Sequence, residues 1–230
     1  MTQTQSIILI ADQKVLNIPI QECHEPLLDL KDQSKILYGP SPEIDNNFCY
    51  TQLRSTIYTK LIQAQNHLPP HLRLCLYEGL RAISLQEYLF KKRWDTIKMR
   101  YREWSDHDLY QEVIKMVSPV TTLDGKQNIP PHSTGAAVDI YLVDAKTHLP
   151  VEMGILAKDW MQDTDGILSY TDSTVISEEA KKNRSILSEA MIGAGFVNYP
   201  TEYWHWSYGD RYWSFIQGEP HAFYGPVTDF

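Results

Sequence analysis

The chain has 230 residues, of which 43% are hydrophobic and 22% are charged, and this composition excludes the disordered, collagen-like and membrane-embedded classes. Its formal net charge of −8 repels the phosphates of nucleic acids and anionic lipid surfaces, so neither is an expected partner. A chain of this length buries enough apolar surface for one stable core, and we expect a single domain over residues 1–230.

The cysteines and the amino terminus indicate where the protein resides. Cys23, Cys49 and Cys75 are odd in number and widely spaced, which favours reduced thiols over disulfides or a zinc ribbon. A short apolar run at residues 6–11 has no basic residue before it and is too short for a signal peptide. No stretch reaches the roughly 18 apolar residues that span a membrane. The sequence therefore predicts a cytoplasmic protein without a membrane span, and it leaves the oligomeric state open.

The first half of the chain predicts helices on either side of a strand. Apolar residues recur at helical spacing over 51–66, which predicts an amphipathic helix. Alternating leucines predict a strand over 72–77. A capping-box pattern that begins at Ser84 predicts a second helix from that residue, with a partner helix over 106–117.

The second half adds two strands and a helix. Alternating apolar residues predict a strand over 137–143, and alternating aromatic residues predict another over about 203–208. Between them, Ser177 is a suitable cap for a helix over 177–192. Helices and antiparallel-looking strands are mixed without a regular βαβ rhythm, so we predict an α+β fold with a small, mostly antiparallel sheet.

Two segments contain residue types that metal-assisted hydrolysis requires. In the first, Asp139 alternates with the apolar residues of its strand, and Gly135 can turn the chain so that His132 folds back toward this carboxylate. In the second, Glu202 and His205 are three residues apart, which places them on opposite faces of a regular strand. Glu202 must therefore lie in the entering loop or at a bulge to share a site with His205.

Together these residues fit a catalytic zinc site. Zinc in a hydrolase usually keeps three protein ligands and an open position for water. His132, Asp139 and His205 make such a set, and Glu202 remains as a base that does not bind the metal. The large aromatic residues near His205 could flank the site, but we expect ordinary core packing for at least half of them: Tyr203, Trp204, Trp206 and Tyr208.

The two segments resemble the zinc D-alanyl-D-alanine dipeptidases of the VanX type, which belong to a larger group of D,D-peptidases with HxxGxAxD and ExxH motifs. Residues 132–139 match the first motif at every fixed position, and residues 202–205 match the second. Scattered blocks over about 36–213 add to the similarity. The resemblance implies one zinc ion per chain, with His132, Asp139 and His205 as ligands and Glu202 as general base and acid.

The resemblance also implies a role for Arg81. In the family an arginine follows a strand and supports the developing oxyanion, and Arg81 has a similar position after the strand predicted at 72–77. An arginine at a strand end can point a fixed pair of donors at a charged intermediate.

The sequence departs from the family around the expected substrate pocket. A serine usually stands two residues before the first ligand histidine, whereas this chain has Pro130, which offers neither a hydroxyl nor an N–H group. The segment after Gly154 also fails to continue the family pattern. The resemblance implies hydrolysis of D-Ala-D-Ala or a related D,D-dipeptide. A D,D-carboxypeptidase that trims longer stem peptides and a catalytically silent zinc-binding module remain as alternatives.

Overall fold

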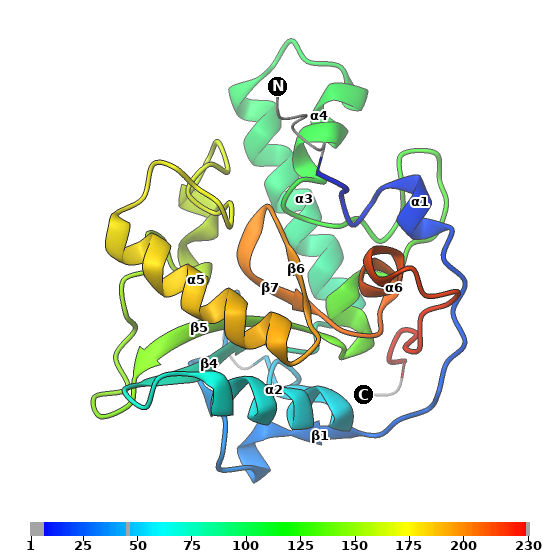
Figure 1. Cartoon of the computed structure of the whole chain (residues 1–230). Helices are drawn as coiled ribbons and strands as arrows, with labels where there is room; N and C mark the ends of the chain where they lie inside the picture. Colours follow the sequence, from blue (N-terminus) through cyan, green and yellow to red (C-terminus); the bar gives the residue numbers. More distant parts are fainter. Residues whose placement is uncertain (1–6, 45–46, 229–230) are drawn as a thin grey trace.

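Short strands and helices alternate along the computed structural model, which describes residues 7–44 and 47–228 (Figure 1). Ser6, the first residue of the amino-terminal apolar run, lies outside the described residues. The described α-helices are α1 (Gln13–Leu16), α2 (Ser55–His67), α3 (Ile83–Arg100), α4 (Asp106–Val113), α5 (Glu178–Gly193) and α6 (Arg211–Gln217). The strands are β1 (Leu27–Asp29), β2 (Leu37–Tyr38), β3 (Gln52–Arg54), β4 (Leu72–Glu78), β5 (Ala137–Asp144), β6 (Val197–Tyr199) and β7 (Glu202–Ser207). Three 3-10 helices complete the set: η1 (Leu30–Asp32), η2 (Pro131–Thr134) and η3 (Ala157–Gln162).

A five-stranded sheet with the order β2-β4-β5-β7-β6 forms the centre of the fold. The neighbours β4 and β5, β5 and β7, and β7 and β6 are antiparallel, whereas β2 runs parallel to β4. Strands β1 and β3 form a separate antiparallel pair. The predicted α+β class with a mostly antiparallel sheet is therefore confirmed.

The two faces of this sheet have different environments. On one face Leu76 of β4 lies opposite Ile140 of β5, and both belong to the main apolar cluster with Leu61 of α2 and Leu187 of α5. Helices α2 and α5 cover this face, where burying one leucine contributes about 1.5–3 kcal/mol (Figure 1). Successive side chains of a strand point to opposite faces, so Asp139 lies on the other face, as predicted. Ile140 and Asp139 of β5 thus face opposite sides of the sheet, and Asp139 faces the candidate site.

The structure corrects two predicted helix starts. The helix predicted over 51–66 begins at Ser55, because residues 52–54 pair with β1 as strand β3, and this pairing overrides the local helical spacing. The helix predicted from Ser84 begins at Ile83, and no side chain caps it. The first helical bond runs from the Gln86 N–H to the Ala82 carbonyl, so the capping-box prediction is wrong.

The other predicted elements are present with small shifts at their ends. The helix predicted over 106–117 ends at Val113, after which residues 114–116 continue as turns. Ser177 accepts a hydrogen bond from the Ala180 N–H and caps α5, as predicted. The three predicted strands correspond to β4, β5 and β7. Cys23, Cys49 and Cys75 are free thiols. Within the described ranges, no helix combines the length and apolarity needed to cross a bilayer.

Candidate metal centre

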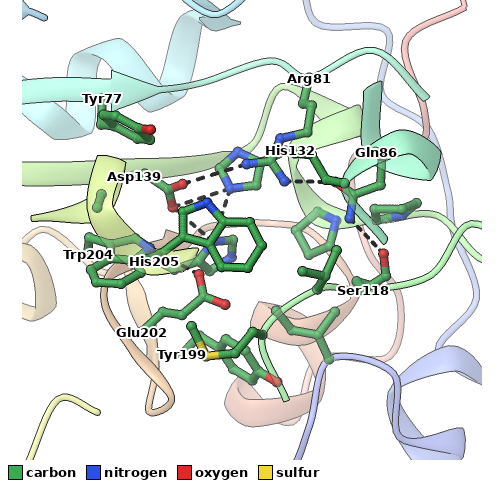
Figure 2. A pocket seen from close by; sticks show the side chains of 18 of the residues that line it. Tyr77, Arg81, Gln86, Ser118, His132, Asp139, Tyr199, Glu202, Trp204 and His205 are labelled. Carbon is green, nitrogen blue, oxygen red and sulfur yellow. Dashed lines mark hydrogen bonds and ion pairs between the residues drawn. The ribbon is translucent and has the colours of Figure 1, made fainter. Parts of the chain in front are cut away.

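His132, Asp139 and His205 converge on one point, as the sequence predicts (Figure 2). The His132 Nε2 atom lies 3.1 Å from His205 Nδ1 and 3.3 Å from Asp139 Oδ1. The third side of this triangle, between His205 Nδ1 and Asp139 Oδ1, is also 3.1 Å. All three residues are buried, so these contacts are shielded from bulk water.

The triangle has the size that a tetrahedral zinc ion requires. Zinc–nitrogen and zinc–oxygen bonds are roughly 2.0–2.2 Å long, so two ligands of a tetrahedron lie about 3.3 Å apart. The three distances are close to this edge, and the donor set of two histidines and a carboxylate suits zinc. Although burial raises the pKa of Asp139, the two histidines lower it overall, so this side chain is a carboxylate. These residues therefore fit a zinc ion.

The chain before β5 fixes how His132 faces this point. Gly135 has a φ of 69°, a left-handed conformation that glycine adopts without strain, and it ends the η2 turn that carries His132. The His132 Nδ1–H group donates to the Gly79 carbonyl over 2.8 Å. This bond selects the tautomer in which Nε2 has a free lone pair for a metal. A side chain at position 79 would place its Cβ 2.7 Å from the Gln52 carbonyl oxygen, so only glycine fits there.

A large irregularity in the pairing of β6 with β7 brings Glu202 and His205 to the same pocket. Asn198 pairs with Trp206 but the next residue, Tyr199, pairs with Glu202, so the residues between Glu202 and Trp206 bulge out of register. The Asn198 side-chain amide lies 3.2 Å from the Glu202 carbonyl and 3.0 Å from the His205 carbonyl. The same amide nitrogen lies 3.4 Å from the carbonyl oxygen of Tyr203. Of the two predicted placements of Glu202, the structure has the bulge, and the Asn198 side chain spans it.

Glu202 lies beside the metal-binding triangle without belonging to it. The carboxylate is buried, and its Oε2 atom accepts a hydrogen bond of 3.0 Å from the Trp204 indole N–H. Burial and the nearby charge of Asp139 raise the pKa of Glu202 to about 8, although His132 and Arg81 oppose the shift. A carboxyl with a raised pKa can both accept and return a proton near neutral pH.

Arg81 reaches the same pocket from the loop after β4. Its guanidinium forms an ion pair with the fully buried Glu78 and donates to the Gln86 side-chain oxygen over 2.9 Å. The Nη2 atom also lies 3.9 Å from Asp139 Oδ2. Burial alone would lower the pKa of Arg81, but the carboxylates of Glu78 and Asp139 raise it overall, so the group stays charged.

All five predicted site residues line one pocket, and so does Pro130, at the place where the sequence departs from the family. Of the four aromatic residues considered near the site, Trp204 alone lines the pocket. Tyr203, Trp204 and Trp206 all belong to the main apolar cluster, and Tyr208 packs against it.

Several residues of the site were not predicted. Glu43, Gln86 and Trp160 line the pocket, while Gly79 and Glu78 act from outside it by holding His132 and Arg81. An acidic residue directly after a proline-rich loop was the one signal for Glu43.

Three donor atoms facing one point, with an unligated carboxylate beside them, are what a metallopeptidase needs, and the chain is a metallopeptidase. It belongs to the peptidase M15 family, described as D-Ala-D-Ala dipeptidase, whose model matches residues 50–221.

The individual proteins that resemble this chain share less than a third of its residues. The chain is 28% identical over 244 residues to a D-alanyl-D-alanine dipeptidase of Synechocystis sp., and the match covers 92% of this chain and 96% of that protein. Among solved structures, the LD-carboxypeptidase LdcB is 13% identical, with 86% of this chain and 76% of that chain covered and a TM-score of 0.32. A variant of the vancomycin-resistance D,D-pentapeptidase VanY, in complex with Zn(II), is 14% identical with a TM-score of 0.34 and covers 81% of this chain and 91% of that chain.

Proposed function

We propose that this protein hydrolyses D-Ala-D-Ala, or a closely related D,D-dipeptide, with one zinc ion held by His132, Asp139 and His205. Glu202 is the general base and acid, and Arg81 stabilises the oxyanion. The observation that carries the proposal is the triangle of donor atoms, 3.1–3.3 Å on each side, with the buried Glu202 carboxylate next to it. The family and its curated dipeptidase relative support the choice of substrate.

The residues of the chain divide the reaction between them. When bound, zinc supplies a Lewis acid that lowers the pKa of water toward about 7 and polarises the substrate carbonyl. Glu202 takes a proton from the attacking water and later gives it to the leaving amine, which its raised pKa favours. The Arg81 guanidinium, held by Glu78 and Gln86, donates to the oxygen on which negative charge develops. No acyl-enzyme forms, because water is the nucleophile.

Metal content tests the ligand set directly. Elemental analysis of the purified protein should give about one zinc per chain, and a chelator should remove activity that added zinc restores. His132→Ala and His205→Ala should each lose bound zinc and unfold at lower temperature, since metal binding adds to folding stability. The matched control is His107→Ala, an exposed histidine on α4 away from the site. Stoichiometric zinc in the double variant His132→Ala/His205→Ala would show that the ion binds elsewhere.

Three substrates test the reaction. We expect hydrolysis of D-Ala-D-Ala, no hydrolysis of L-Ala-L-Ala and poor turnover of acyl-D-Ala-D-Ala. Pro130 offers no hydroxyl to the substrate, so transition-state stabilisation should be weaker by about 1–3 kcal/mol than with a serine at this position. A higher kcat/KM for the acylated peptide would identify a D,D-carboxypeptidase instead. A zinc-loaded protein that cleaves none of the three would be a silent binding module.

A further inference from the structure

One carboxylate in the metal pocket has no part in the chemistry described above. Asp139, Glu202 and Glu43 all line this pocket, and the proposed function uses the first two. Glu43 belongs to the loop between β2 and β3, and its φ of 60° is rare for a residue with a side chain. Such a conformation persists only where the surroundings impose it, and it is often found at binding sites.

The Glu43 side chain is held by two aromatic residues. The Trp160 indole N–H donates to Glu43 Oε1 over 2.8 Å, and the Tyr77 hydroxyl donates to the same oxygen over 3.4 Å. Both bonds go to Oε1, and no other hydrogen bond from the described residues reaches Oε2, which is the oxygen we assign to a further donor. Burial raises the pKa of Glu43, while the Trp160 bond and the charge of Arg81 lower it in part. A partly desolvated carboxylate of this kind is stabilised by a cation placed against it.

The charges in the pocket suit a ligand with opposite ends. In Figure 2, Tyr77, which contacts Glu43, lies on one side of the metal-binding residues, and Gln86 and Ser118 lie on the other. Arg81 lies between the two sides, since it donates to Gln86 and also lies 3.9 Å from Asp139. A free dipeptide is a zwitterion, with an ammonium group at one end and a carboxylate at the other. Glu43 is therefore placed to receive the ammonium end.

The same residues also border the pocket on one side. Glu43, Tyr77, Ala157 and Trp160 line both this pocket and a neighbouring cavity of about 660 Å³. An acyl group on the substrate nitrogen would remove the positive charge that the Glu43 carboxylate is placed to receive. The charge at this wall therefore disfavours an acylated substrate.

We propose that Glu43 is a specificity-determining residue: its carboxylate accepts hydrogen bonds from the substrate ammonium group and so selects peptides with a free amino terminus. This inference rests on the proposed function, because it takes a D,D-dipeptide as the substrate. It assigns the selection to a residue of the β2–β3 loop, outside the two metal-site segments.

The interaction between Glu43 and the substrate ammonium group can be measured by comparing two proteins on two substrates, as in a double-mutant cycle. The substrates are D-Ala-D-Ala and N-propionyl-D-alanine, which is the same molecule without the amino group. The variant is Glu43→Gln, which keeps an oxygen for Trp160 and removes the charge. We expect the wild-type protein to prefer D-Ala-D-Ala, and we expect Glu43→Gln to reduce this preference, as a ratio of kcat/KM values, by about tenfold to a hundredfold. The control Glu87→Gln, an exposed residue on α3, should leave the ratio unchanged.

The outcomes separate this inference from the proposed function. If the wild-type protein cleaves D-Ala-D-Ala and Glu43→Gln shows the same preference, the role of Glu43 is wrong and the proposed function stands. If the zinc-loaded wild-type protein cleaves neither compound, both are wrong. Should Glu43→Gln fail to fold, Trp160→Phe decides by the same ratio, because it removes the bond that orients Glu43 and keeps an aromatic wall. A ratio in Trp160→Phe equal to that of the wild type would then overturn the inference.

Discussion

Replacing Asn198 with alanine should reduce both the free energy of unfolding and the catalytic rate, and the two losses can be compared. The Asn198 amide nitrogen makes its two shortest contacts with the carbonyls of His205 and Glu202, at 3.0 and 3.2 Å, and its side-chain oxygen accepts a hydrogen bond from the Thr171 hydroxyl. Each neutral bond contributes about 1 kcal/mol, and a buried carbonyl left without a donor costs about 1–3 kcal/mol. We therefore expect Asn198→Ala to lower the free energy of unfolding by about 2–3 kcal/mol.

The effect on catalysis should be larger than this loss alone explains, because the bulge sets where Glu202 lies relative to His205. A shift of about 1 Å between groups that act together costs about a hundredfold in rate, so kcat/KM should fall by about that factor in folded, zinc-saturated Asn198→Ala. Urea unfolding followed by tryptophan fluorescence gives the stability, and D-Ala-D-Ala hydrolysis gives the rate. Thr171→Val, which removes only the outer bond, should cost about 1 kcal/mol and less than tenfold in rate. A destabilised Asn198→Ala protein with wild-type kcat/KM would refute the positioning role.

Three further predictions concern the base, the support of the first histidine and the response to acid. Glu202→Gln should keep its zinc and lose about 10²–10⁴-fold in kcat, and full activity in the zinc-loaded variant would move the base elsewhere. Gly79→Ala should weaken zinc binding in a competition titration with a chelator, because the new Cβ would lie 2.7 Å from a backbone carbonyl; wild-type affinity would contradict this. Burial raises the pKa of Glu25, but hydrogen bonds from Ser55 and Tyr224 lower it overall. The ionised Glu25 therefore stabilises the fold above about pH 4.5, and this stabilisation is lost as the pH falls through the lowered pKa of the folded state. Between pH 7 and pH 3, the free energy of unfolding measured in urea should therefore fall less in Glu25→Gln than in the wild type. Equal decreases in the two proteins would show that Glu25 does not contribute to the pH dependence of stability.

Local patterns predicted those parts of the fold and site that depend on neighbours in sequence. The turn at Gly135 and the alternation around Asp139 were sufficient to predict that His132 folds back toward the carboxylate. The spacing of Glu202 and His205 required either a position in the entering loop or a bulge, and a register shift is present there. Both arguments use the two-residue period of a strand, which holds whatever the strand packs against.

Contacts between distant segments could not be predicted in this way. The helix start at Ser55 depends on the pairing of β3 with β1, which no local periodicity contains. The support of His132 by the Gly79 carbonyl joins residues 53 positions apart. Glu43 contacts Trp160 from a distance of 117 positions, so its place in the pocket follows from the tertiary fold alone.

The register pair Asp139–His205 also bears on how the protein folds. The two residues face each other on adjacent strands although 66 positions separate them in sequence, and closing so long a loop is slow because of its entropy. We therefore expect the donor atoms of the site to meet late on the folding pathway. An ion that binds to such late contacts leaves the folding rate nearly unchanged and slows unfolding. For this protein, metal occupancy would then determine how long the native state persists rather than how fast it forms.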